Sequence, residues 1–197
     1  MAQAISRWGE YGARPRPLAV NADLFAHLEV RESVEVDCTL EAVWSLVTDV
    51  TRIGEFSPEC IDACWVDGTG EVGVGSRFDG TNRVVDDENE ILWIRPCTVT
   101  AIKSGRRFAY AVGDRYDGSP ASMWEFELEL RTGGVCRINQ IFRHHRDGLS
   151  GLRHAADADP ERAGEIVTAR SAGVAEGMRQ TLQRMKTVLE QRPNPLQ

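Results

Sequence analysis

Alternating apolar and polar side chains predict that the folded domain begins near residue 28. The apolar positions of this first segment are Leu28, Val30, Val34 and Val36. Such a period of two predicts a half-buried strand, because successive side chains of a strand point to opposite faces. Residues 40–50 instead carry apolar side chains at helical spacing behind Thr39, a residue type that caps helices. A second short helical turn is expected before Pro58, so the domain begins strand, helix, helix.

After Pro58 the pattern predicts six successive strands with short turns between them. They are expected at 59–66, 76–85, 91–102, 106–113, 121–130 and 135–145. The alternation is clearest in 121–130, where Trp124, Phe126, Leu128 and Leu130 alternate with Glu125, Glu127 and Glu129. One face of this strand is expected to be dry and the other wet. Short connections between successive strands indicate an antiparallel meander.

A long amphipathic helix is predicted from about residue 160 to 191. Its apolar stripe consists of Val174, Met178, Leu182, Met185 and Leu189. At 1.5 Å per residue such a helix would be roughly 45 Å long, enough to lie across a seven-stranded sheet. The preceding segment 144–160, with three histidines and three aspartates, is interpreted as a solvated, mobile lid or linker.

Length and composition indicate one globular domain with extensions. We expect an N-terminal arm at 1–27, a single domain at 28–192 and a C-terminal tail at 193–197, with Trp8 and Leu24-Phe25 as the residues that would pack the arm on the domain. Hydrophobic residues make up 42% of the 197 and the net charge is −7, which argues against a general affinity for nucleic acid. Without an apolar stretch that would span a membrane or serve as a signal peptide, we expect a cytoplasmic protein with no membrane insertion.

No motif for a metal, a cofactor or a known nucleophile was found. The five cysteines are interpreted as reduced, small hydrophobic residues: Cys38, Cys60, Cys64, Cys97 and Cys136. The cluster of His144, His145, His154, Asp157 and Asp159 matches no ligand spacing, so neither a metal nor a cofactor is expected. The sequence also lacks a Gly-x-Ser-x-Gly motif and a glycine-rich phosphate loop.

The order of elements, together with several segments, resembles the SRPBCC superfamily of START-like, Bet v 1-like and polyketide cyclase/dehydrase proteins. These segments are TLEAVWSLVTDVTRIGEFSPEC, VGSRFDGTNR, WIRPCTVTAIKSGRRFAYAV, ASMWEFELEL and GMRQTLQRMKTVLE. The resemblance covers about residues 28–191 and is closest to the bacterial polyketide cyclase/dehydrase-like branch. It implies an α+β helix-grip fold, in which a curved seven-stranded antiparallel sheet surrounds a long C-terminal helix. It also implies a cavity for a hydrophobic small molecule between sheet and helix.

Strand phase identifies polar side chains that would face this cavity. Gln140 and His144 share the phase of Ile138 and Phe142, and Asn82, Tyr110 and Glu32 share that of apolar neighbours. The expected ligand-binding residues are Trp44, Phe78, Asn82, Tyr110, Trp124, Phe126, Gln140, Met178 and Leu182. The catalytic candidates are Glu32, His144 and Tyr110. Each polar residue also has a structural interpretation, in which it bonds to ordinary internal partners.

Three functions follow as alternatives. The first is binding of a lipid-like or polyketide-like molecule in the cavity. The second is an enzyme of cyclase, aromatase or dehydratase type, in which Glu32 or His144 moves protons while Asn82, Gln140 or Tyr110 orients the substrate. The third is a module that forms a homodimer through its arm and long helix and has a filled cavity. Two ionisable groups converging in one pocket would favour the enzyme.

Overall fold

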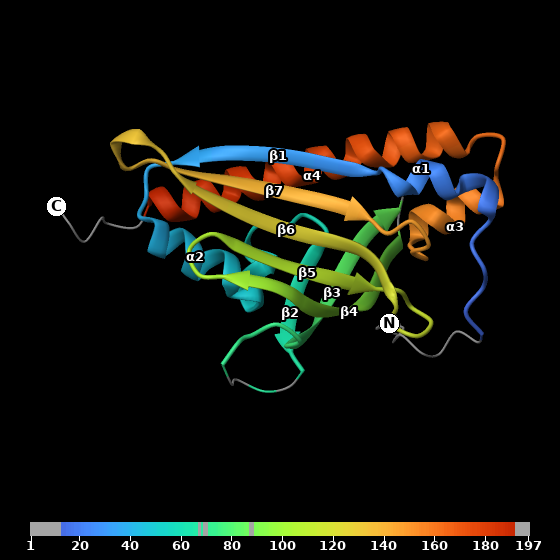
Figure 1. Ribbon diagram of the computed structural model, residues 1–197, viewed down its shortest axis with the longest axis horizontal. Coiled ribbons are helices and arrows are strands. Elements are labelled where there is room, and N and C mark those ends of the chain that lie inside the picture. The colour runs from blue at the N-terminus through green and yellow to red at the C-terminus, as the bar shows by residue number, and fades with distance from the viewer. Residues whose placement is uncertain (1–12, 67, 69–70, 87–88, 192–197) are drawn as a thin grey trace.

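Seven strands form one antiparallel sheet in the order β1-β7-β6-β5-β4-β3-β2 (Figure 1). The computed structural model describes residues 13–66, 68, 71–86 and 89–191. The strands are β1 (Glu29–Val36), β2 (Cys60–Trp65), β3 (Arg77–Asp86), β4 (Asn89–Lys103), β5 (Arg107–Gly113), β6 (Pro120–Leu130) and β7 (Cys136–His144). The expected antiparallel sheet is confirmed.

The two helical segments between β1 and β2 carry the chain from one edge of the sheet to the other. These are α2 (Leu40–Thr48) and the 3-10 helix η2 (Val50–Glu55). The Thr39 hydroxyl accepts a hydrogen bond from the Ala42 amide and caps α2, as the sequence predicts. From β2 the strands return as a meander, in which the 3-10 helix η3 (Thr132–Gly134) joins β6 to β7.

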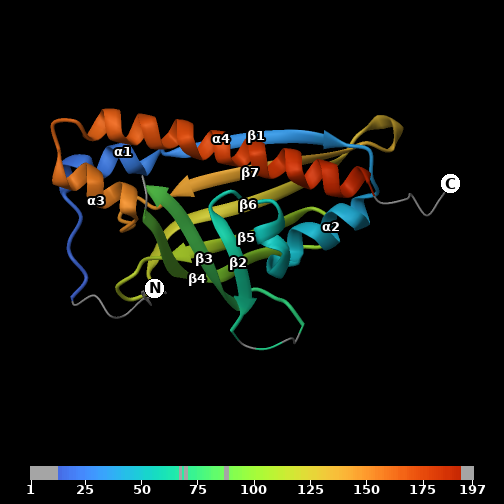
Figure 2. The same ribbon diagram turned by 180° about the vertical axis from the view of Figure 1, so that it is seen from behind.

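The long helix α4 (Ala163–Glu190) lies along the concave side of the sheet and packs mainly on β1 (Figure 2). Its expected apolar stripe is buried, from Val174 at 8% exposure to Met185 at 1%. This burial fixes the helix on the β1 and β7 side of the sheet. None of the helices in the described ranges has the length and apolar character needed to cross a membrane.

The segment 144–160 is not the solvated lid or linker that its composition indicates, because it contains the helix α3 (Gly151–Ala158). Arg153 is only 1% exposed, and its guanidinium donates to Asp157 and to the carbonyl oxygen of Arg146. The charged side chains that indicated exposure thus neutralise one another inside the fold. α3 packs on α4 and closes one end of the molecule (Figure 1).

The end of the N-terminal arm is also built into the fold. It forms the 3-10 helix η1 (Ala19–Asn21) and the short helix α1 (Ala22–Ala26). Phe25 is fully buried with its ring 4.7 Å from the Arg153 guanidinium, whereas Leu24 is 39% exposed. Of the packing residues expected in the arm, Phe25 is therefore in contact with the domain, and Trp8 lies outside the described residues.

One glutamate of β6 is buried, although its face of the strand is expected to be wet. Glu125 is 1% exposed because Arg107 and Arg143, from the strands on either side, cover it with hydrogen bonds of 2.5 and 2.9 Å. Burial acts to raise the pKa of Glu125, but the two guanidinium groups outweigh it and hold the pKa below its usual value. The carboxylate is therefore buried beneath these two partly exposed arginines on the side of the sheet away from the cavity, a pairing that periodicity does not reveal.

Candidate functional site

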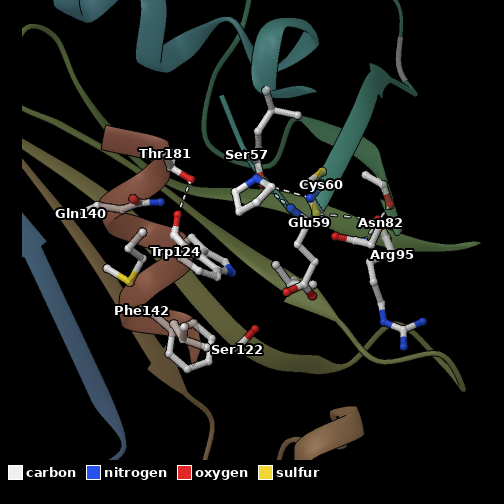
Figure 3. A pocket seen from close by; sticks show the side chains of 18 of the residues that line it. Ser57, Glu59, Cys60, Asn82, Arg95, Ser122, Trp124, Gln140, Phe142 and Thr181 are labelled. Carbon is white, nitrogen blue, oxygen red and sulfur yellow. Dashed lines mark hydrogen bonds between the residues drawn. The ribbon is translucent and has the colours of Figure 1, made fainter. Parts of the chain in front are cut away.

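A cavity of about 840 Å³ lies between the concave face of the sheet and α4. Strands β3 to β7 line one side of it and α4 lines another. The end of α2, the segment from η2 to the start of β2 and the beginning of α3 supply most of the remaining wall. Figure 3 shows Gln140, Trp124 and Phe142 across the cavity from Ser57 and Cys60. The helix-grip fold therefore leaves internal space beside its helix.

Most of the wall is aromatic and aliphatic. Seven of the nine side chains expected to bind ligand line it: Phe78, Asn82, Tyr110, Trp124, Phe126, Gln140 and Met178. The ring of Phe78 meets that of Tyr110 edge-on with centroids 5.1 Å apart, and the centroids of Trp124 and Phe142 are 5.0 Å apart. These contacts hold the rings in fixed positions, so the apolar wall has a defined shape.

Gln140 contributes a polar group that has no partner. The residue is 5% exposed, and its Oε1 is buried without a hydrogen bond to any described residue. Its neighbours in strand register are Phe126 on β6 and Glu32 on β1, and the Glu32 carboxylate is bonded to Arg179. Leaving such a group unpaired costs about 1–3 kcal/mol. The amide is thus available to a polar group of a ligand.

Asn82 lines the cavity but already has an internal partner. Its Nδ2 donates to the carbonyl oxygen of Gly80, two residues earlier in β3, at 3.3 Å. Gly80 is also part of the wall, and the sulfur atoms of Cys60 and Cys97 lie close to it. A Cβ at Gly80 would stand 3.3 Å from Cys60 Sγ and 3.9 Å from Cys97 Sγ.

The two cysteine thiols beside Gly80 are wall residues that sequence reasoning did not assign to the site. Burial raises the pKa of Cys60 to about 12 and that of Cys97 well above its usual value. Both are therefore neutral thiols and extend the apolar wall. The two cysteines share the strand phase of other wall residues, and this could have assigned them to the wall. The signal is weak, however, because cysteine is common in any protein core.

Tyr110 and His144, two of the three catalytic candidates, both line the cavity. Burial raises the pKa of the Tyr110 hydroxyl well above its usual range, so it is a neutral donor. Burial also lowers the pKa of His144 to about 4, so its imidazole is neutral. His144 Nδ1 lies 2.7 Å from the His145 carbonyl oxygen and Nε2 lies 2.7 Å from Ser150 Oγ.

Three of the expected site residues lie outside the cavity wall. Glu32 is bonded at 2.6 Å to Arg179 on α4, which occupies its carboxylate at the edge of the sheet. Leu182 is 2% exposed and packs in the main core, where the helix touches the sheet directly. Trp44 lies on α2 and packs against that same core from outside. Helical and strand phase gave the correct face for these residues but not their position along the cavity.

Polar contacts between α4 and the segment before β2 form a rim that the sequence did not reveal. Arg170 donates to both oxygens of Glu59 at 2.9 and 3.1 Å, and both residues are at the cavity. About two turns further along α4, Gly177 faces Pro58, whose Cγ would lie 3.6 Å from an added Cβ. The rim residues are far apart in sequence, so only the fold brings them together.

A family model described as polyketide cyclase/dehydrase and lipid transport matches residues 27–190. This match spans the whole sheet, α4 and the cavity between them. The chain belongs to the polyketide cyclase/dehydrase and lipid transport family. The resemblance noted in the sequence is confirmed, and so is the helix-grip fold that it implies.

Solved structures similar to this cyclase/dehydrase family member include a protein described as Polyketide_cyc-like from Corynebacterium glutamicum. The two are 25% identical, with a TM-score of 0.57 over 82% of this chain and 91% of that one. The Zhui aromatase/cyclase of a Streptomyces species shares the fold at 15% identity and a TM-score of 0.57, over 86% of this chain and 97% of that one. No curated protein matches the chain.

Proposed function

We propose that this polyketide cyclase/dehydrase family member binds an apolar, lipid-like or polyketide-like molecule that carries at least one polar group. The observation that carries the proposal is the unpaired Gln140 amide in an otherwise apolar cavity of about 840 Å³. Known ligand pockets have volumes of about 300–1,000 Å³ and use few polar groups to orient a largely apolar ligand. The neutral Tyr110 hydroxyl is a second group that would orient the ligand.

The arrangement favours binding over cyclase, aromatase or dehydratase chemistry. Of the expected proton carriers, Glu32 is held by Arg179 away from the cavity, so His144 lacks the second carrier that this chemistry would use. Tyr110 has a raised pKa and is a poor acid at neutral pH. The dimer alternative assumed a filled cavity, and the open cavity removes that argument for it.

Filling the cavity tests the proposal. Val112 lines the cavity, so Val112→Phe should reduce the binding of an environment-sensitive naphthalene sulfonate dye by at least about tenfold, because the added ring occupies ligand space. Val66→Phe is the matched control, since Val66 is 50% exposed and should bind dye like the wild type. Equal dye affinity in the two variants would refute binding inside the cavity. Native mass spectrometry of protein from its own source would then identify the ligand class.

A further inference from the structure

Ser150 and His144 form a hydrogen-bonded pair at the α3 end of the cavity. His144 Nε2 lies 2.7 Å from Ser150 Oγ, and both residues line the cavity wall. His144 is the last residue of β7 and Ser150 is the N-cap of α3, so the pair joins two elements. Neither residue is needed by the proposed binding function.

The second ring nitrogen of His144 determines the direction of this hydrogen bond. Nδ1 lies 2.7 Å from the carbonyl oxygen of His145, and a carbonyl only accepts, so Nδ1 must carry the proton. Burial lowers the pKa of His144 to about 4, which keeps the ring neutral and leaves a lone pair on Nε2. Ser150 therefore donates its hydroxyl proton toward His144.

The loop between the two residues is fixed in place. The His145 carbonyl also accepts from the Gly148 amide at 3.0 Å, and the His145 amide donates to the Ala121 carbonyl at 2.9 Å. Gly148 packs so closely on Ala121 that an added Cβ would lie 2.3 Å from its carbonyl oxygen. Such packing holds the hydroxyl at one distance from the imidazole without a ligand present.

Backbone donors stand next to the hydroxyl. Gly151 and Leu152 are the first two residues of α3 and line the cavity, and amides at these helix positions have no acceptor within the helix. The Ser150 oxygen itself accepts from the Arg153 amide at 3.1 Å. In the same cavity, the Gln140 amide is 5% exposed and its oxygen is unpaired, which independently indicates that a polar molecule belongs there.

We infer that Ser150 is a nucleophile activated by His144, and that the protein transfers or hydrolyses the acyl group of an apolar ester or thioester. This inference rests on the proposed function, because the apolar acyl chain would occupy the cavity. Ser150 Oγ would bond to the acyl carbon while its proton passes to His144 Nε2 and the carbonyl electrons move to oxygen, facing the Gly151 and Leu152 amides. Collapse breaks the bond to the alcohol or thiol, which leaves with the proton from His144. Water then releases the acid by the same steps and restores the serine.

A serine-directed phosphonofluoridate reagent tests the inference, with the modified residue mapped by peptide mass spectrometry. We expect one adduct at Ser150 and none at Ser122 or Ser171, the other serines of the wall near this end. Ser150→Asn should abolish the adduct and keep the melting temperature, because asparagine caps a helix as well as serine does. His144→Ala should slow labelling by about 100-fold or more, and added imidazole should restore it.

The same samples separate this inference from the proposed function. Dye binding by the wild-type protein without an adduct at Ser150 would overturn the nucleophile and leave the binding function standing. Labelling at Ser150 that is equally fast in His144→Ala would also overturn it. Absence of dye binding from the wild type would instead count against the proposed function itself. Hydrolysis of p-nitrophenyl butyrate should be lost in Ser150→Asn, and its persistence would contradict the assignment.

Discussion

At the scale of single residues, Gln140 is the side chain on which the proposed binding of a polar ligand group depends. Gln140→Met retains the length of the side chain but removes the amide. We expect it to weaken binding of an apolar molecule with a hydroxyl or carbonyl group by about tenfold, the value of roughly one hydrogen bond. The free energy of unfolding should stay equal or rise, because a buried unpaired amide no longer has to be desolvated.

The control for this prediction is Gln183→Met, on the solvent-exposed side of α4. Isothermal titration calorimetry with the ligand identified by native mass spectrometry would measure both variants. Affinity unchanged in Gln140→Met, together with a loss of stability, would show that the amide has a structural role.

Strand phase was sufficient to predict that Gln140 and Tyr110 face the cavity, because a two-residue period fixes the face of a side chain. It could not predict whether each group is paired. Asn82 bonds to Gly80 within its own strand, and Glu32 bonds to Arg179 of a distant helix. The link between His144 and Ser150 depends on a loop whose path the sequence pattern does not determine.

At the scale of elements, Arg153 joins α3 to the end of the N-terminal arm. Its guanidinium bonds to Asp157 and to the carbonyl oxygen of Leu18, and it covers the ring of Phe25. Arg153→Met removes all three interactions, and we expect a loss of about 3 kcal/mol in the free energy of unfolding, as for one partner of a buried ion pair. Chemical denaturation measures the loss, and proteolysis should cleave near Leu18 more readily.

The control is Arg162→Met, since the Arg162 side chain is 67% exposed and its ion pairs are at the surface. Its effect should stay below about 1 kcal/mol. Equal effects of the two substitutions would mean that the buried contacts of Arg153 do not stabilise the arm.

The same elements show where sequence reasoning fails. The sheet and α4 follow from long, regular patterns that each bury one face. The helix α3 is only eight residues long, and its buried face consists largely of Arg153 and Ala156, so its pattern resembles a polar loop. Tertiary contacts stabilise this helix, and those are not visible in local periodicity.

At the scale of the whole molecule, His144 should make stability depend on pH. Its pKa is lowered from 6.5, the value for an exposed histidine, to about 4 in the folded protein, chiefly because the ring is buried. The charges of the nearby Arg153 and His145 lower the pKa further, while the hydrogen bond to the His145 carbonyl acts to raise it. The unfolded chain therefore binds the proton first as the pH falls. Stability is fully present above pH 6.5 and is lost as the pH falls toward 4, by about 3 kcal/mol in total.

Urea denaturation of the wild type and of His144→Gln between pH 7.5 and 4 measures this contribution. Carboxylates change the stability of both proteins, so the difference between the two curves isolates His144. The stability difference should shrink as the pH falls through this range. A difference that is independent of pH would contradict a lowered pKa in the folded state.

The way α4 is attached to the sheet should determine how fast a bound molecule enters and leaves the cavity. One side of the helix is joined to β1 by buried apolar packing, whereas its other side meets the segment before β2 through the exposed Arg170–Glu59 pair and the contact of Gly177 with Pro58. Surface ion pairs break and re-form at little cost in free energy, whereas opening buried apolar packing costs much more. The helix is thus held firmly on its β1 side and only weakly on the side that faces the segment before β2. We expect a bound molecule to enter and leave the cavity on this weakly held side. The exchange rate should then depend on breaking a few surface contacts and not on unfolding of the sheet.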